Sequence, residues 1–366
     1  MKQLLFICCF CLGSLSGFGQ QGGAWHSFWN TDTTLFGFKD ATGKIVIQPS
    51  YSSIFYVRKL DHIAALAEQK GEQWNSYYLT RSGKKAAWDS LYIFDNASDC
   101  ESEGFIRFRD PKTDKAGMLN RHGQAVIPAA YNDLSPVHNG MFIALRDAHK
   151  QHWDTAHHSG CDHFSWAGGR ELLIDTANRI LIDSFPYNQE LDLSSLHIGP
   201  KPAPQPDRIS FKGTDGRYYS FIDMDKEFER WLQQHLLQQL SAQTMAKHAF
   251  ATICTWNEDE GWIFQKASSV LSRNEALLKA KLKCVQDKTC DYTIVSGSLN
   301  QFIYTSDDFN IYFNNCGNAE SWRYPTKSII IDYRNGTDFK QDHFEFLRTP
   351  QGYKLICISL GKDTLK

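Results

Sequence analysis

Short apolar runs rich in residues that favour β-strands recur through the first half of the chain, and polar turn residues separate the runs. Lys44–Ile47 and Gln124–Ile127 are two such runs, and their composition is typical of short β-strands. The pattern changes after the middle of the chain. Within Asp225–His248 the apolar residues recur at spacings of three, four and five, which predicts an amphipathic helix. A second helix is expected to begin at the capping-box sequence Ser272–Glu275.

Four segments of the first half share one chain-reversal pattern. Each has an anchor residue, and the anchors are Gly43, Gly83, Gly123 and Asn178, which lie 40, 40 and 55 positions apart. Three positions before each anchor stands a residue whose side chain can accept a hydrogen bond from the backbone two residues on, namely Asp40, Thr80, Asn120 and Asp175. Gly and Asn adopt a left-handed backbone cheaply, so the pattern predicts a type I turn closing a β-hairpin. We therefore expect β-hairpin repeats of about 40 residues.

The last third of the chain combines the predicted helices with further strands. These strands are expected at Tyr292–Gln301, Asn310–Phe313, Ser328–Tyr333, His343–Arg348 and Tyr353–Ser359. Helices followed by neighbouring strands predict an α+β domain in which helices pack on an antiparallel sheet. Between the two halves, alternating prolines at Pro200, Pro202, Pro204 and Pro206 are typical of an extended spacer. We therefore divide the chain into a β-repeat domain (22–192), a linker (193–207) and an α+β domain (208–366).

The sequence around the first anchor resembles a known repeat. Gly37–Tyr51 is similar to the WG (KWG) repeat of bacterial proteins, and Ala116–Tyr131 matches it less fully. The Trp-Gly pair that names the family is replaced by Phe36-Gly37 and Ala116-Gly117. The resemblance implies an accessory, extracytoplasmic β-repeat module that usually has no catalytic activity. Near the C-terminus, Phe344–Leu360 resembles the final hairpin of nuclear-transport-factor-like and SnoaL-like domains, which implies a pocket between helices and a curved sheet.

The first twenty residues have the features of a secretory signal peptide. Lys2 is followed by the short apolar run Leu4–Leu12 and by small residues up to Gly19, which predicts a signal peptide over residues 1–19. A transmembrane anchor is the less favoured alternative, because a bilayer needs about 20 apolar residues. A lipoprotein signal is also less favoured, because Cys8, Cys9 and Cys11 lie inside the apolar run. We expect an exported protein, periplasmic or secreted, with no membrane span.

Export would permit disulfides in the mature chain. Removal of the signal peptide leaves seven of the ten cysteines, so at least one would stay unpaired within the chain. Cys284 and Cys290 enclose a short loop and are the most plausible bridge, with single buried thiols as the alternative.

An insertion before the fourth anchor, residues 147–166, is rich in side chains that bind metals. The candidate ligands are His149, His152, His158, Cys161 and His163. Imidazole and thiolate are preferred ligands of zinc, copper and nickel. The spacing matches no known metal motif, so a solvated hairpin loop is the favoured interpretation.

Composition and motifs narrow the function further. The formal net charge of −2 argues against nucleic-acid binding, which usually needs a basic surface. The sequence contains no nucleophile elbow, zinc-protease motif, P-loop or dinucleotide fingerprint. We therefore expect an exported, non-catalytic binding protein without a cofactor, whose repeat surface contacts a protein or a cell-envelope glycan. Two alternatives stay open: an enzyme or small-ligand carrier with a pocket in the C-terminal domain, and metal binding by residues 147–166. A filled, apolar C-terminal interior would count against the first alternative.

Overall fold

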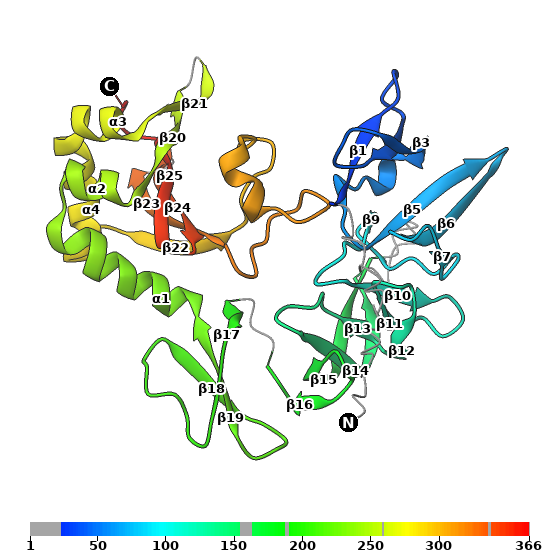
Figure 1. Ribbon diagram of the computed structural model, residues 1–366. Coiled ribbons are helices and arrows are strands. Elements are labelled where there is room, and N and C mark those ends of the chain that lie inside the picture. The colour runs from blue at the N-terminus through cyan, green and yellow to red at the C-terminus, as the bar shows by residue number, and fades with distance from the viewer. Residues whose placement is uncertain (1–22, 154–162, 187–189, 258–259, 336–337, 366) are drawn as a thin grey trace, which may run out of the picture.

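The computed structural model describes residues 23–153, 163–186, 190–257, 260–335 and 338–365. The predicted signal peptide, residues 1–19, lies outside this part of the chain, as do two of the predicted metal ligands, His158 and Cys161. Figure 1 shows a β-rich region, built from β1 to β16, beside a domain in which helices lie on one face of a sheet. No helix in the described ranges is both long and apolar enough to cross a membrane.

The repeat region consists of several small antiparallel sheets. The first has the spatial order β4 (Lys59–Leu60), β1 (Trp25–Trp29), β2 (Leu35–Lys39), β3 (Ile45–Ser52), β5 (Ile63–Lys70), β6 (Gln73–Thr80) and β7 (Lys85–Ala86), and a 3-10 turn, η1 (Ser53–Phe55), follows β3. The next sheets are β8 (Ile93–Phe94) with β9 (Ala97–Ser98), then β10 (Phe105–Asp110), β11 (Lys115–Asn120) and β12 (Ala125–Tyr131), and then β13 (Asp133–Leu134), β14 (Met141–His152), β15 (Phe164–Asp175) and β16 (Ile180–Ile182). Neighbouring sheets share buried clusters, because one cluster joins the first sheet to β10 and β11 and another joins β11 and β12 to β14 and β15.

The four predicted chain reversals all close hairpins, namely β2–β3, β6–β7, β11–β12 and β15–β16. At each one the backbone N–H of the anchor donates to the carbonyl three residues earlier, at 2.8–2.9 Å. The φ angles of Gly43, Gly83, Gly123 and Asn178 are 86°, 82°, 66° and 62°. This is the left-handed conformation that Gly and Asn tolerate best, which explains the residue types at the anchors.

The segment predicted as a linker differs from expectation in its first half. Residues 193–199 belong to strand β17 (Leu191–Gly199), which pairs with β19 (Tyr218–Asp223), and β19 pairs in turn with β18 (Arg208–Lys212). The prolines occupy only the loop between β17 and β18, where no ladder needs their missing N–H groups. Phe221 of this sheet packs with Phe185 and Leu173 of the fourth repeat. The small sheet therefore continues the repeat region.

The C-terminal domain has a six-stranded sheet with helices on one face (Figure 1). The strand order is β21 (Gly261–Lys266), β20 (Ala249–Asn257), β25 (Gly352–Leu360), β24 (Asp338–Thr349), β23 (Thr326–Asn335) and β22 (Tyr292–Gly297). The helical segments are α1 (Met224–Trp231), the π-helical η2 (Leu232–Leu236), the 3-10 turn η3 (Leu237–Gln239), α2 (Ala242–Lys247), α3 (Ala267–Arg273) and α4 (Glu275–Asp287). The predicted fold class, β-hairpin repeats followed by an α+β domain, is confirmed. One strand pair, β20 with β25, is parallel, because the chain crosses over through α3 and α4 between them.

The helical segments begin and end differently from the prediction. The helix expected over Asp225–His248 is interrupted, because Leu240 is extended and the Ser241 side chain accepts a hydrogen bond from the backbone of Thr244 to start α2. Ser272 lies inside α3, so the predicted capping box does not form. Asn310–Phe313, expected as a strand, instead falls largely in the 3-10 helix η4 (Asp307–Tyr312), which buries Phe309 and Tyr312 at the spacing of three that such a helix brings onto one side.

Residues 298–325, which we call the arm, cover the second face of the C-terminal sheet and reach the repeat region (Figure 1). In the arm, Tyr304, Phe309 and Tyr312 pack on sheet residues that include Leu347 and Ile356. Farther along, the backbone N–H of Lys59 donates to the carbonyl of Asn315 at 3.1 Å. The arm is thus a second connection between the two halves of the molecule, in addition to the chain itself.

Candidate functional site

The glycine that follows Phe36 in the first repeat, and its equivalent after Ala116, have a packing role. A Cβ atom on Gly37 would lie 2.3 Å from the carbonyl oxygen of Ile47, in the partner strand of the same hairpin. On Gly117 a Cβ would lie 2.6 Å from the ring of Phe108 and 2.8 Å from the carbonyl oxygen of Ile127. Both positions therefore need glycine because another strand passes too close for a side chain. These residues shape the scaffold.

The predicted metal site is only partly within the described residues. His149 and His152 lie three positions apart on β14, and residues at this spacing in a strand point to opposite faces. The ring of His163 stacks on Trp153, with centroids 6.0 Å apart. In the described part of the chain, no three His, Cys, Asp or Glu side chains come close enough to hold a metal ion. His158 and Cys161 fall outside it.

An aromatic groove runs along the second, third and fourth repeats. We define the aromatic groove by two adjoining depressions, of about 390 and 600 Å³, that share Leu145, Trp166 and Glu171. The first depression is also lined by Tyr92, Phe94, Arg107, Asp133 and Pro136, and the second by Gly168, Arg170, Phe185 and Pro186. The long β14–β15 hairpin brings Trp166 to the place where the two depressions meet.

Asp133 organises the polar side of this groove. One carboxylate oxygen accepts a hydrogen bond from the Tyr92 hydroxyl at 2.6 Å, and the other accepts one from Nε1 of Trp166 at 3.1 Å. Burial raises the pKa of Tyr92 above its usual range, so its hydroxyl stays protonated and remains a donor. Both aromatic rings are thereby held in fixed orientations from the same carboxylate.

The Arg107 guanidinium in the groove is held by several neighbours. The Arg107 guanidinium lies over the Tyr92 ring, 4.1 Å from its centroid, and pairs with Asp99. Arg107 also donates to the carbonyl of Leu134 at 2.7 Å. At the rim, Phe94 on the β8–β9 hairpin is 72% exposed. The groove thus offers apolar ring faces and fixed dipoles, which suit a ligand held by stacking and hydrogen bonds.

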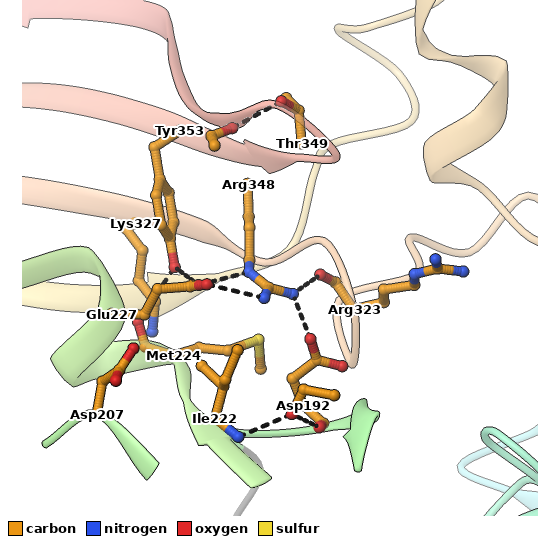
Figure 2. Close-up of polar contacts among 12 residues, drawn as sticks. Asp192, Asp207, Ile222, Met224, Glu227, Arg323, Lys327, Arg348, Thr349 and Tyr353 are labelled. Carbon is orange, nitrogen blue, oxygen red and sulfur yellow. Dashed lines mark hydrogen bonds and ion pairs between the residues drawn. The ribbon is translucent and has the colours of Figure 1, made fainter. Parts of the chain in front are cut away.

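A buried ionic network fixes the position of the C-terminal domain against the β17–β19 sheet (Figure 2). Figure 2 shows Arg348 of β24 between Asp192 of β17 and Glu227 of α1, with N–O distances of 2.9 and 2.7 Å. The hydroxyl of Tyr353 donates to Glu227 at 2.9 Å. Close by, the fully buried Lys327 pairs with Glu190 at 2.6 Å. These groups satisfy one another, so we interpret the network as a structural joint.

The interior of the C-terminal domain is filled. Between helices and sheet, the gap lined by Leu236, Met245, Leu282, Phe344, Phe346 and Leu355 has no room for a water molecule. All six side chains are apolar and buried. Apolar side chains therefore fill the space between the helices and the sheet at this place.

Two segments of the chain, residues 36–59 and 117–147, match the family described as WG containing repeat. They begin at the two replaced Trp-Gly positions and cover the hairpins β2–β3 and β11–β12. The resemblance read from the sequence is confirmed at these two places. No curated protein and no solved structure matches the chain. The chain is therefore similar to WG-repeat proteins over these segments, in a mainly β region of repeated hairpins.

Sequence reasoning did not identify the groove residues. Trp166 lies in the segment that the sequence presented as a His-rich insertion, and Phe94 belongs to a strand of two residues. No local spacing connects either of them with Tyr92 or Asp133. In the sequence, tyrosine does recur after the first three anchors, as Tyr51, Tyr92 and Tyr131. All three are buried, which fits packing within the repeats.

Proposed function

We propose that this chain is an exported, non-catalytic binding protein that holds a segment of a protein or a cell-envelope glycan in its aromatic groove. The observation that carries the proposal is the half-buried Trp166 ring, which the Asp133 carboxylate orients beside the exposed Phe94 while the same carboxylate is held by the buried Tyr92. Preorganised rings bind with little loss of side-chain entropy on association. The β-repeats form the scaffold, and the arm and the C-terminal domain brace it.

Two features support export. The predicted signal peptide is the first. The second is a pair of disulfides, Cys284–Cys290 with Cα atoms 5.4 Å apart and Cys100–Cys316 with Cα atoms 6.1 Å apart. Disulfides persist mainly in oxidising compartments outside the cytosol. The test is the location of the tagged protein after cell fractionation, and recovery in the cytosol with the first residues intact would contradict export.

The charge pattern of the groove favours a ligand that is neutral or weakly charged. Arg107 is matched by Asp99, and Arg170 pairs with Asp183 at 3.2 Å. A strongly charged ligand would have to displace these existing pairs. A polysaccharide or an extended peptide would instead bind through its apolar faces and its hydrogen-bonding edges.

The aromatic groove is tested with a substitution that does not disturb the fold. Phe94 is largely exposed, so we expect Phe94→Ala to leave the melting temperature unchanged and to weaken binding about tenfold, as loss of an aromatic anchor does. The matched control is Trp74→Ala, because Trp74 is also exposed, at 53%, but does not line the groove. Binding of the purified chain is measured against isolated cell-envelope polysaccharide and, separately, against envelope proteins. Equal losses in both variants would overturn the assignment to this groove.

A further inference from the structure

Two cysteines outside the disulfides lie side by side in the C-terminal sheet. Cys254 of β20 is directly paired with Cys357 of the parallel strand β25. On its other side, Cys357 is paired with Glu345 of β24, so the three residues form a row across neighbouring strands. The arm covers this row, and the hydroxyl of its Tyr304 lies 3.5 Å from an oxygen of Glu345.

The backbone geometry at this pair is compatible with a bridge. Neighbouring strands lie about 4.8 Å apart, and the Cα atoms of disulfide-bonded cysteines lie about 4.4–6.8 Å apart. Both thiols are buried in the same apolar cluster. The other four cysteines within the described residues are already joined in disulfides. A chain that reaches a compartment able to form those two bonds meets the oxidant that a third would need.

We propose that Cys254 and Cys357 are the site of a third disulfide, formed by exchange with a disulfide-bearing oxidant such as a thiol–disulfide oxidoreductase or a small-molecule disulfide. The thiolate of one cysteine attacks the external disulfide, forms a mixed disulfide and releases the first thiol of the oxidant. The second cysteine, as its thiolate, then attacks the sulfur of the first cysteine in this mixed disulfide. The remaining sulfur of the oxidant leaves and takes up a proton as the second thiol. Two thiols of the chain lose two electrons and two protons, and one external disulfide is reduced to two thiols.

The surroundings distinguish the two thiols once the domain is folded. A hydrogen bond from Cys357 lowers the pKa of Cys254, whereas the same bond and burial raise the pKa of Cys357. In the folded sheet Cys254 is therefore the more readily ionised of the two thiols. Glu345, the paired neighbour of Cys357, is placed to accept the second proton, and burial raises the pKa of its carboxyl group. The arm covers both sulfurs, so exchange takes place with the chain before the arm has docked.

The Cys254–Cys357 bond would join the β20–β21 hairpin to the rest of the sheet across the parallel pair β20 and β25. The β20–β21 hairpin is held to the other strands only through β25, and the register of this contact is irregular between Ala249 and Cys254. Parallel pairing is also slightly less stable per residue than antiparallel pairing. A covalent link at Cys254 would therefore secure the hairpin where the ladder is weakest.

The experiment is refolding of the reduced, full-length mature chain in a glutathione redox buffer, followed by alkylation of the remaining thiols and peptide mapping. We expect three linked peptide pairs, one of which joins Cys254 to Cys357, with Cys161 alkylated. Cys161→Ser is the matched control, and it should leave all three pairs unchanged. Alkylation of both Cys254 and Cys357 beside the two intact bridges, or linkage of either residue to Cys161, would overturn the proposal. The mapping needs no variant of the paired cysteines, so it does not depend on their tolerance to substitution.

Discussion

Cys100 of the repeat region and Cys316 of the arm are joined by a disulfide that spans 216 positions of the sequence. Noncovalent contacts reinforce it, because Arg58 donates to the side chain of Gln301 at 3.0 Å and Trp322 stacks on His138 with centroids 3.9 Å apart. The chain already connects the two halves through β19 and α1. The disulfide adds a second, covalent connection, so the repeat region and the C-terminal domain are held as one body.

The first prediction concerns this connection. A disulfide that closes so long a loop restricts the unfolded chain strongly, and we expect Cys100→Ala/Cys316→Ala to lower the free energy of unfolding by about 3–5 kcal/mol. The loop between Cys284 and Cys290 spans 6 positions, so Cys284→Ala/Cys290→Ala should cost only about 2 kcal/mol. Denaturant unfolding under non-reducing conditions measures both values. A larger loss for the short loop would show that the long bridge does not constrain the unfolded state.

The second prediction concerns the ionic joint of Figure 2. Arg348→Met leaves Asp192 and Glu227 without their cation in a largely buried place, and we expect a loss of about 3–5 kcal/mol. Arg217→Met is the control, because Arg217 forms an exposed pair with Asp215 and exposed pairs contribute about 0–1 kcal/mol. Urea unfolding compares the two variants. If both changed the unfolding midpoint equally, the joint would have no special role in holding the halves together.

The third prediction separates the two kinds of glycine in a repeat. Gly37→Ala places a methyl group against the backbone of Ile47, so we expect a loss of about 2–3 kcal/mol or a rearranged hairpin. Gly43→Asn adds a side chain in open space, at a left-handed position that Asn tolerates, and should cost less than about 1 kcal/mol. Asn178, the anchor of the fourth hairpin, already occupies the equivalent conformation. Thermal denaturation provides the comparison, and a greater loss for Gly43→Asn would contradict the packing role of Gly37.

Local turn chemistry explains why the hairpins were predictable from the sequence. Each of the four reversals depends on residues within a five-residue window, as with Asp40 accepting from the backbone of Thr42 at 2.9 Å and Gly43 adopting a left-handed φ. The prediction of one helix over Asp225–His248 was wrong for an equally local reason. Leu240 is extended and ends the first helical segment, and Ser241 then serves as the N-cap of α2. Short-range preferences thus set the elements and most of their boundaries.

The features that the sequence did not predict depend on residues far apart in the chain. The Cys100–Cys316 bridge and the contact of Trp166 with Asp133 join residues that no spacing rule connects. Seven mature cysteines allow many pairings, and a groove formed by three repeats has no continuous motif. Residues 193–199 of β17 fall within the predicted linker because prolines follow them closely, although the prolines occupy only the loop after the strand. The candidate site therefore emerged from the packing of the repeats on one another.

The fourth prediction is a pH dependence at the contact between the arm and the repeats. Burial, with a smaller effect of Arg107, lowers the pKa of His138 to about 4, whereas an unfolded histidine titrates near 6.5. Between these two pH values the unfolded chain binds the proton and the folded chain does not. The contribution of His138 to the free energy of unfolding is therefore complete above pH 6.5 and falls by up to about 3 kcal/mol as the pH decreases toward 4.

The substitution His138→Phe isolates this effect, because phenylalanine preserves the ring stack on Trp322 and cannot titrate. Glu320, on the arm, acts in the opposite direction, because burial raises the pKa of its carboxyl group and acidification then favours the folded state. Only the difference between wild type and variant is therefore informative. Urea unfolding at intervals from pH 4 to pH 7 should show the wild type losing stability relative to His138→Phe as the pH falls. A constant difference across this range would mean that His138 carries its proton in the folded state as readily as in the unfolded chain, and that the contact with the arm does not exclude water from it.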